Sequence, residues 1–379
     1  MQPEDFAPSQ RGFLLHSPND YWAFVPPSLP ARLSLSADLV QALSEADRAI
    51  GELSGVGTWL PDPYILIAPF LRREAVLSSR IEGTEATVTD LVLFEAQAPT
   101  APRTDDVHEV GNYVIALEQA TDPDRQLPLS LRVIRDIHHT LMTGVRGDRA
   151  TPGEFRRSQN WIGPPGCLLA DATFVPPPVD EMTTCLHDLE MYLHATVPIP
   201  PLVRIAAVHY QFEAIHPFLD GNGRVGRLLI SLLLQEWGLL PKPLLYLSAF
   251  FESRRDEYYD RLLMVSTHGD WESWLRFFLE GVAAGSTDVI DRARKMIGLR
   301  QEYHRRLQVT RSSALLLKLV DHLFESPAIR ITMAQEHLGV TFRAASLNVQ
   351  KLVDAGILHE VTGRARDRVF VAREILALL

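Results

Sequence analysis

Hydrophobic residues recur at helical spacing along most of the chain, with polar residues between them. This periodicity is typical of amphipathic helices, which bury one face and expose the other. Internal repeats and low-complexity tracts are absent from the sequence. The pattern predicts a mainly α-helical protein, with clear helices at 36–54, 107–119, 131–143, 179–195 and 270–284.

Two more helices are predicted on either side of a short turn in the middle of the chain. The first, Leu202–Ile215, should end before His216, because Pro217 cannot continue a helix and disfavours helical angles in the residue before it. The second should run from Arg224 to about Trp237. His216 is therefore expected at a corner where one helix ends and the next approaches.

The turn between these helices has the features of an anion site. Gly221-Asn222-Gly223 allows consecutive backbone amides to converge, and the helix that follows adds the positive end of its dipole. Arg224 and Arg227 lie three residues apart on one helix face, where they would repel each other unless an anion or a carboxylate lies between them. A polyphosphate meets this requirement.

Two further side chains of the turn could act as a metal ligand and as a base in a reaction of such a polyphosphate. Asp220 offers a hard oxygen ligand, which suits Mg²⁺ shared with substrate phosphates. The imidazole of His216, with an ordinary pKa of about 6.5, can take a proton from a hydroxyl near neutral pH. A histidine before proline, or a Gly-Asn-Gly sequence, is by itself more often structural. Their combination with an acid and two arginines favours a functional site.

The twelve residues from His216 to Arg227 read HPFLDGNGRVGR and resemble the HPFx(D/E)GNGRxxR motif of Fic proteins at every specified position. The resemblance implies a Fic-type helical bundle that transfers AMP from ATP to a Ser, Thr or Tyr hydroxyl of a target protein and releases pyrophosphate. It implies His216 as the general base and Asp220 as the Mg²⁺ ligand. Asn222 and the neighbouring amides would position the α-phosphate, and Arg224 and Arg227 would contact the outer phosphates.

Glycines and tyrosines near the motif refine what the resemblance implies. In relatives of the Doc type a lysine takes the place of Gly223, and those proteins resemble kinases that transfer the γ-phosphate. A glycine leaves room for the nucleotide orientation used in AMP transfer, so Gly221 and Gly223 are both expected in the ATP site. Downstream, RDEYYDRL with Tyr258 and Tyr259 resembles the family's RxxYYxxL helix, which contributes to the adenine pocket. An aromatic residue on a helix is often a core residue instead, and this alternative applies to both tyrosines.

A distant segment contains a carboxylate in an unfavourable place. The pattern predicts a helix at Pro69–Ile81 closed by Gly83, with Glu82 in its last turn. A negative charge there opposes the helix dipole and costs about 0.3–1 kcal/mol unless a cation compensates. With Ser78 four residues earlier, the segment resembles the (S/T)xxxE(G/N) inhibitory motif of self-restrained Fic proteins, which implies that Glu82 pairs with Arg227 and leaves ATP unproductively bound. The alternative is an ordinary exposed glutamate.

Short β-like runs precede the central helices. Gln159–Ile162 and Thr173–Val175 flank a Gly-Pro turn, which predicts a β-hairpin. In the Fic family such a hairpin forms a flap over the active site and holds the target segment as an added strand. The alternative is a proline-rich surface loop without strand pairing.

The last part of the chain has a different pattern. Helices are predicted at 312–324, 333–338 and 342–355, followed by strand-like runs at 356–361 and 369–371 around a loop rich in arginine. This order predicts a C-terminal winged helix-turn-helix domain.

The charge of this C-terminal region bears on DNA binding. From Arg311 onward, nine Lys and Arg stand against seven Asp and Glu, which gives a net charge of +2 in a chain of net charge −10. Such a charge is weak for nonspecific DNA affinity. Arg364, Arg366 and Arg368 nevertheless concentrate positive charge on the wing, and Arg343 could reach a base edge. The module could instead serve dimerisation or target docking.

The length and composition fit this organisation. With 379 residues, 46% of them hydrophobic, the chain is expected to bury a sizeable core and to contain two or three domains. The expected parts are an N-terminal helical region at 1–106 with the inhibitory helix at about 69–83, a Fic catalytic core at 107–290, a helical connector at 291–310 and the winged helix at 311–379.

The cysteines, the N-terminal segment and the other histidines bear on the cellular compartment and on metal binding. Cys167 and Cys185 are too few for a disulfide framework or a zinc site and are expected to be reduced core thiols of a cytoplasmic protein; the alternative is one bridge between them. The polar start and the lack of any long apolar stretch argue against secretion and membrane insertion. His138 and His139 are adjacent, so they point to different helix faces and do not suggest a metal site. The resemblance also implies a homodimer.

Two functional classes follow from these observations. The first is a protein adenylyltransferase restrained by Glu82, with ATP as its substrate and Mg²⁺ as its cofactor. The second is a DNA-binding transcriptional regulator whose Fic core is vestigial or senses a nucleotide. The complete set of His216, Asp220, Arg224 and Arg227 favours the enzyme, since a regulator would not need all of them.

Overall fold

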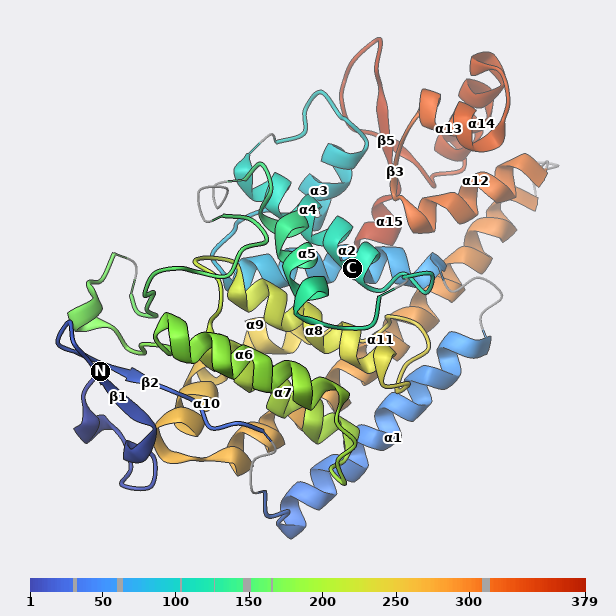
Figure 1. The fold of residues 1–379 in the computed structure, drawn as a ribbon. Helices are drawn as coiled ribbons and strands as arrows, with labels where there is room; N and C mark the ends of the chain where they lie inside the picture. The colour runs from blue at the N-terminus through green and yellow to red at the C-terminus, as the bar shows by residue number, and fades with distance from the viewer. Residues whose placement is uncertain are drawn as a thin grey trace.

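The computed structural model describes residues 1–29, 33–59, 64–102, 104–125, 127–145, 151–164, 166–308 and 314–379, and it is mainly helical, as the sequence predicts (Figure 1). The helices are α1 (Ala37–Trp59), α2 (Tyr64–Ile81), α3 (Val88–Glu95), α4 (Asp105–Ala120), α5 (Leu131–Met142), α6 (Val179–His194), α7 (Pro201–Ile215), α8 (Asn222–Glu236), α9 (Ser248–Ser253), α10 (Arg255–His268), α11 (Trp271–Gln308), α12 (Ala314–Glu325), α13 (Ile331–Leu338), α14 (Phe342–Asp354) and α15 (Arg373–Leu376). The strands are β1 (Leu14–Ser17), β2 (Tyr21–Phe24), β3 (Ala328–Arg330), β4 (His359–Glu360) and β5 (Val369–Val371), and short 3-10 turns occur at η1 (Pro3–Asp5), η2 (Arg11–Phe13) and η4 (Leu169–Asp171).

Helices α7 and α8 form the centre of the bundle. Most residues of α7 are buried on every side, as is typical of a helix that other helices surround. Helix α8 follows after the turn and contacts α2, α4 and α5. The predicted turn therefore lies where several helices converge.

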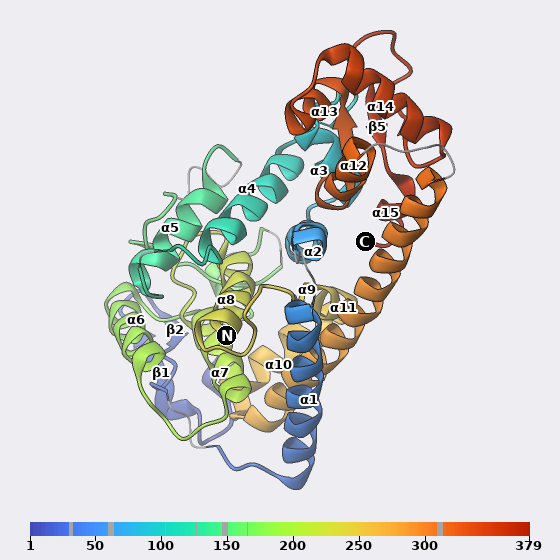
Figure 2. The ribbon, with the colours of Figure 1, turned by 90° about the vertical axis from the view of Figure 1, so that its right-hand side faces the viewer.

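One long helix replaces two predicted elements. The stretch 270–284 was predicted to be a helix of the core, and 292–308 to be part of the helical connector at 291–310, whereas α11 runs through both as 38 continuous residues. Helix α1 lies along α11, as Figure 2 shows. The residues between the two stretches, GSTDVID, contain no proline, so nothing stops the helix.

The flap is less regular than predicted. Instead of two strands at 159–162 and 173–175, the structure has a single antiparallel bridge between Ile162 and Phe174. The backbone groups of this pair exchange hydrogen bonds of 2.8 and 3.0 Å. The hairpin of β1 and β2, which the sequence analysis did not predict, lies beside the flap, and Phe24 N–H donates to the Val175 carbonyl at 2.9 Å.

The C-terminal region follows the predicted order of elements, with one strand more. Helices α12, α13 and α14 precede β4 and β5, while β3, which was not predicted, completes an antiparallel sheet in the order β3-β5-β4. Gly339 ends α13 with φ of 64° and lets the chain turn into α14. Residue 312, the predicted start of the first helix, lies outside the described residues. The assignment of this region as a winged helix stays a prediction.

Candidate active site

His216 lies where α7 ends, in a backbone conformation that few residues other than glycine adopt. Its φ and ψ are 49° and 61°, in the left-handed region, which costs roughly 1–2 kcal/mol for a residue with a Cβ. Its ring Nδ1 lies 3.3 Å from the carbonyl oxygen of Glu213. Since a carbonyl only accepts, Nδ1 carries the proton in this contact and Nε2 keeps a lone pair.

The surroundings of His216 keep its ring neutral. Desolvation of the imidazole lowers its pKa to about 4, and the positive charge of Arg156 acts in the same direction. The imidazole is therefore unprotonated at neutral pH, the form that can accept a proton. The sequence analysis predicts a base at this corner, and the fold gives His216 a pKa below the ordinary value.

The turn after His216 is closed by the side chain of Asn222. Phe218 N–H donates to Asn222 Oδ1 and Asn222 Nδ2 donates to the Phe218 carbonyl, both at 2.8 Å. Both ends of the amide are thus engaged in the turn, and the side chain is 2% exposed. Asn222 therefore shapes the turn in this structure, and its contact with a phosphate stays a prediction.

Gly221, the residue directly before α8, has a backbone conformation that favours glycine. Its φ is +80°, and a Cβ on it would lie 2.8 Å from Met142 Sδ. The first turn of α8 follows directly, and the amides of a first helical turn are not used by the helix itself. This arrangement suits an anion at the start of α8.

Asp220 lies at the open edge of this turn. One carboxylate oxygen accepts a hydrogen bond from Gly221 N–H at 2.6 Å and lies 3.6 Å from Arg224 Nη2, while the side chain is 52% exposed. Within the described ranges, no cluster of three or more His, Cys, Asp or Glu side chains could hold a metal ion by itself. A single exposed carboxylate fits an Mg²⁺ ion that takes its other ligands from phosphates and water.

The two arginines of α8 each have a carboxylate partner from another helix. Arg224 Nη1 lies 2.9 Å from Glu109 Oε2 of α4, and both side chains are buried. Arg227 Nη2 lies 2.6 Å from Glu82 Oε1, just beyond the end of α2. The expected repulsion between the arginines is therefore balanced by two separate acids, and no shared anion is needed, because both α4 and α2 contact α8.

The contact of Arg227 with α2 includes more than the carboxylate. Its Nε donates to Ser78 Oγ, and its Nη2 donates to the Ser78 carbonyl, both at 2.9 Å. Partial desolvation disfavours the ionised form of Glu82, but attraction to Arg227 outweighs it and lowers the pKa. A Cβ on Gly223 would overlap the Glu82 carboxylate, so the glycine at 223 also admits this contact. Gly83, with φ of 94°, turns the chain away after Glu82.

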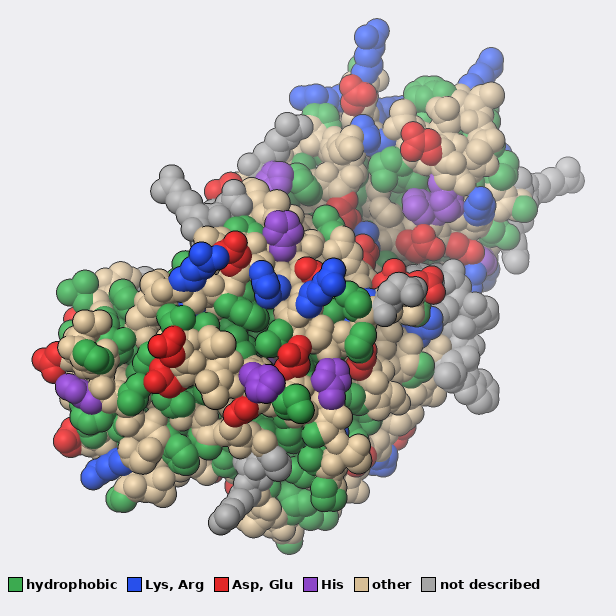
Figure 3. All heavy atoms as spheres, viewed as in Figure 1, with side chains coloured by type: hydrophobic (Ala, Val, Ile, Leu, Met, Phe, Trp, Pro, Cys, Tyr) green, Lys and Arg blue, Asp and Glu red, His purple; other side chains and the backbone are tan. Residues whose placement is uncertain are grey.

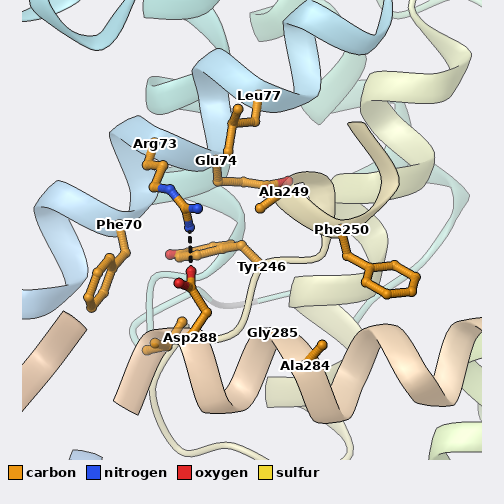
Figure 4. Close-up of a pocket in the computed structure, with 11 residues that line it drawn as sticks. Phe70, Arg73, Glu74, Leu77, Tyr246, Ala249, Phe250, Ala284, Gly285 and Asp288 are labelled. Carbon is orange, nitrogen blue, oxygen red and sulfur yellow. Dashed lines mark hydrogen bonds and ion pairs between the residues drawn. The ribbon is translucent and has the colours of Figure 1, made fainter. Parts of the chain in front are cut away.

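Helix α2 is also fixed by buried or half-buried polar contacts of Glu74 and Arg73. Glu74 accepts hydrogen bonds from Ser248 Oγ at 2.6 Å and from the Tyr113 hydroxyl at 3.2 Å. Arg73 contacts Asp288 of α11 at 3.0 Å, beside a cavity of about 170 Å³ between α2, α9 and α11 (Figure 4). The segment that presents Glu82 is therefore part of the bundle and not a loose arm.

The predicted adenine-pocket tyrosines lie in different surroundings. Tyr258 is buried in an aromatic cluster with Phe251, and its hydroxyl lies 2.9 Å from His209 Nε2. Tyr259 is 40% exposed, and the charges of Glu82 and Arg227 affect its pKa, which desolvation raises to about 12. Tyr258 thus matches the core alternative, and only Tyr259 presents its ring to solvent beside the site.

The sequence analysis missed two residues that hold the turn. The ring of His138 stacks on Phe218 at a centroid distance of 3.7 Å. It accepts a hydrogen bond from Gly153 N–H at 2.9 Å through Nδ1, so Nε2 donates to the Asp220 carbonyl at 3.0 Å. Arg156, 1% exposed, donates from Nε to the His216 carbonyl at 3.0 Å. Neither lies within a recognisable spacing of the motif, so no local signal identifies them.

The fold and the geometry of this turn define a Fic-type helical protein. Two family models match the chain, one for the Fic/DOC family N-terminal region at residues 40–122 and one for the Fic/DOC family at residues 128–234. The two matches contain both Glu82 and the complete turn from 216 to 227. The chain belongs to the Fic/DOC family.

Curated relatives share part of their length with this chain. "Protein adenylyltransferase Fic" of Aedes aegypti is 32% identical over 154 residues, which cover 40% of this chain and 27% of the relative. The protein of the same name in Drosophila grimshawi is 28% identical over 209 residues, which cover 53% of this chain and 39% of the relative. The chain thus spans well under half of the length of these relatives.

Solved structures share the fold. A Fic family protein from Desulfovibrio desulfuricans G20 has a TM-score of 0.57 at 21% identity, with 91% of this chain and 98% of that chain covered. Residues 134–508 of C. elegans Fic-1 give a TM-score of 0.53 at 20% identity, with 68% of this chain and 74% of that chain covered. Among the described residues, no helix combines the length and the apolar character needed to cross a membrane.

Proposed function

We propose that this chain is a protein adenylyltransferase that transfers AMP from ATP to a Ser, Thr or Tyr hydroxyl of a protein, itself included. The observation that carries the proposal is the neutral imidazole of His216 beside the first turn of α8. The names of the curated relatives support it. Every specified residue of the motif is present, and together these residues form one turn, which argues against a vestigial site.

The chemistry follows from these positions. His216 Nε2 accepts the proton of the target hydroxyl while its oxygen forms a bond to the α-phosphorus of ATP. The bond between that phosphorus and the oxygen bridging to the β-phosphate breaks, and pyrophosphate leaves. The amides at the start of α8 stabilise the negative charge that develops on the α-phosphate oxygens. Asp220 would hold Mg²⁺, which when bound neutralises phosphate charge.

The same site would be restrained by Glu82. Arg227 is the cation expected at the outer phosphates, and its Nη2 is engaged by Glu82 and Ser78. A γ-phosphate could reach this guanidinium only after the carboxylate moves, because both acceptors carry negative charge. Removing Glu82 is therefore expected to increase transfer.

The test is label transfer from ATP labelled at the α-phosphate and, separately, at the γ-phosphate, with Mg²⁺ and self-modification as the first readout. We expect α-label only, with Glu82→Gly about tenfold or more above the wild type, since one lost charge contact is worth on the order of 1.4 kcal/mol. His216→Ala in either background should be silent. Glu85→Gly, an exposed glutamate three residues on, serves as the matched control and should equal the wild type.

Each other result has a defined meaning. Incorporation of γ-label would identify a kinase-like relative. No label from Glu82→Gly, even with a cell lysate as the source of targets, would contradict the transfer reaction. Equal rates for Glu82→Gly and the wild type would leave transfer standing and remove the restraint.

A second function, DNA binding by the C-terminal region, is favoured by the exposure of its basic residues. Arg343 at the start of α14 and Arg364 and Arg366 in the loop before β5 are exposed, and Figure 3 shows Lys and Arg side chains projecting from this end of the molecule. Duplex DNA should then bind with an affinity that falls steeply with salt, and Arg364→Ala with Arg366→Ala should reduce the salt slope by about two. Salt-independent or absent retardation would leave dimerisation or target docking as the role of this region.

A further inference from the structure

Arg156 is a buried cation whose partners are backbone carbonyls. Its side chain is 1% exposed, and within the described part of the chain it contacts no carboxylate. Nε donates to the His216 carbonyl at 3.0 Å, Nη1 to the Ser158 carbonyl at 3.2 Å and Nη2 to the Pro177 carbonyl at 2.5 Å. Its own backbone N–H donates to the Pro217 carbonyl at 2.9 Å.

These partners belong to two parts of the site. His216 and Pro217 form the corner that carries the proposed base. Ser158 and Pro177 lie at the two ends of the flap, outside the bridge that pairs Ile162 with Phe174. One guanidinium therefore joins the catalytic turn to both ends of the flap.

The contact with His216 also stabilises an unfavourable backbone. The left-handed conformation of His216 turns its carbonyl toward the flap, where that oxygen accepts hydrogen bonds from Arg156 Nε and from Asn160 Nδ2 at 3.2 Å. A hydrogen bond from a charged donor is stronger than one between neutral groups. A strained residue in a site persists only when its surroundings hold it in place.

We infer that Arg156 is a positioning residue, which holds the base and the flap in one rigid arrangement so that a hydroxyl presented by the flap lies within reach of His216 Nε2. The inference rests on the proposed function. Arg156 does not touch ATP or the target in this role. It acts through the His216 carbonyl on one side and through the Ser158 and Pro177 carbonyls on the other.

The geometry requires an arginine. Three N–H groups of one planar guanidinium donate in three fixed directions, whereas the single ammonium of lysine cannot reach the three carbonyls at once. The conservative variant Arg156→Lys should therefore keep the positive charge but no longer hold the His216 turn and both ends of the flap together, which we call the coupling between turn and flap.

The experiment compares Arg156→Lys and Arg156→Gln with Arg157→Gln, all in the Glu82→Gly background. Arg157 is the matched control, because its side chain is 85% exposed and contacts only Glu154 in the described structure. We expect kcat for transfer from α-labelled ATP to fall about tenfold or more in both Arg156 variants, with the Kd for ATP within about twofold of the parent. Arg157→Gln should match the parent in both quantities.

A second measurement keeps this inference separate from the proposed function. Amide hydrogen exchange at 158–162 and 216–218 should be faster in Arg156→Gln than in Arg157→Gln, whether or not AMP is transferred. If the Glu82→Gly parent transfers no AMP, the proposed function is wrong. The amide exchange measurement still tests whether Arg156 holds the turn and the flap together. If Arg156→Gln does not fold, Arg156→Lys carries both measurements. Exchange and kcat equal to those of the Arg157 control would overturn the inference, as would a loss of ATP affinity that accounts for the whole effect.

Discussion

Two titratable groups at the end of α7 are held neutral by the same surroundings. Desolvation lowers the pKa of His216 to about 4 and raises the pKa of Glu213 to about 8, against the attraction of Arg227. Glu213 packs so closely on α8 that a Cβ on Gly226 would overlap its carboxylate. At this scale, the shift of each pKa from its ordinary value is set by the groups that cover the side chain.

Glu213 should make the stability of the protein depend on pH. Its folded pKa lies above the ordinary value of 4.5, so the folded state keeps a proton that the unfolded chain releases, and stability is lost as the pH rises from 4.5 to about 8. Glu213→Gln removes this loss and should raise Tm more at pH 8 than at pH 5. The measurement is thermal unfolding at both pH values.

The control for this prediction is Glu4→Gln, a change at an exposed glutamate of η1. It should leave the difference in Tm between the two pH values unchanged. If Glu213→Gln behaves in the same way, the pKa of Glu213 is not raised on folding and the prediction is wrong.

At the scale of elements, each of the two arginines of α8 forms an ion pair with a glutamate from another helix or its end. Glu109 comes from the first half of α4, and Glu82 follows the last residue of α2. The two ion pairs differ in exposure, since the Glu109 side chain is 1% exposed and the Glu82 side chain 32%. The Glu109 pair is therefore enclosed in the bundle, whereas the Glu82 carboxylate reaches the surface of the protein.

Glu109→Ala should therefore be strongly destabilising. It leaves Arg224 buried without its carboxylate, and breaking one partner of a buried pair costs about 3–5 kcal/mol of the free energy of unfolding. Urea unfolding measures the change. Glu118→Ala, at an exposed position of the same helix, should stay within about 0.5 kcal/mol of the wild type. Equal effects of the two changes would contradict a stabilising role for the pair.

At the scale of the whole molecule, the C-terminal region packs directly on the helix that presents Glu82. Arg72 of α2 donates to the Glu325 carbonyl at the end of α12 at 2.8 Å and contacts Glu95 of α3 at 2.7 Å. Val92 of α3 packs in one apolar cluster with Val371 of β5. The C-terminal region thus contacts both α2, which Glu82 directly follows, and α3, the next helix along the chain.

Arg72→Ala should loosen this connection. We expect wild-type self-modification with α-labelled ATP to rise about two- to tenfold, since part of a coupling of 1–3 kcal/mol is removed, with no further rise in the Glu82→Gly background. Arg48→Ala, at an exposed arginine of α1 whose ion pair among the described residues is with Glu52, should have no effect. If Arg72→Ala raises self-modification by the same factor in the Glu82→Gly background, Arg72 affects AMP transfer independently of the restraint by Glu82.

The helices and the motif turn were readable from the sequence because their signals are local. Helical periodicity, the proline after His216 and the glycine at 221 act on neighbours within a few residues, so the predicted ends of α4, α5, α6, α7 and α14 lie within about two residues of the observed ones. Short strands such as β3 and the bridge at Ile162 carry too few residues for a periodic signal, and they form only where another segment supplies the partner.

The sequence by itself determined a helical Fic-type protein, the order of its elements and the group of residues from His216 to Arg227 that share one turn. The resemblance to Fic proteins also implied the pairing of Glu82 with Arg227, which the structure contains. Only the tertiary structure decided that Glu109 faces Arg224, that His138 and Arg156 hold the turn, and that His216 is neutral. Glu109 and Arg224 are 115 residues apart, and no local pattern encodes that distance. Desolvation likewise depends on every segment packed around a group, so the pKa of His216 and the burial of Tyr258 arise from the assembled bundle and not from their neighbours in the chain.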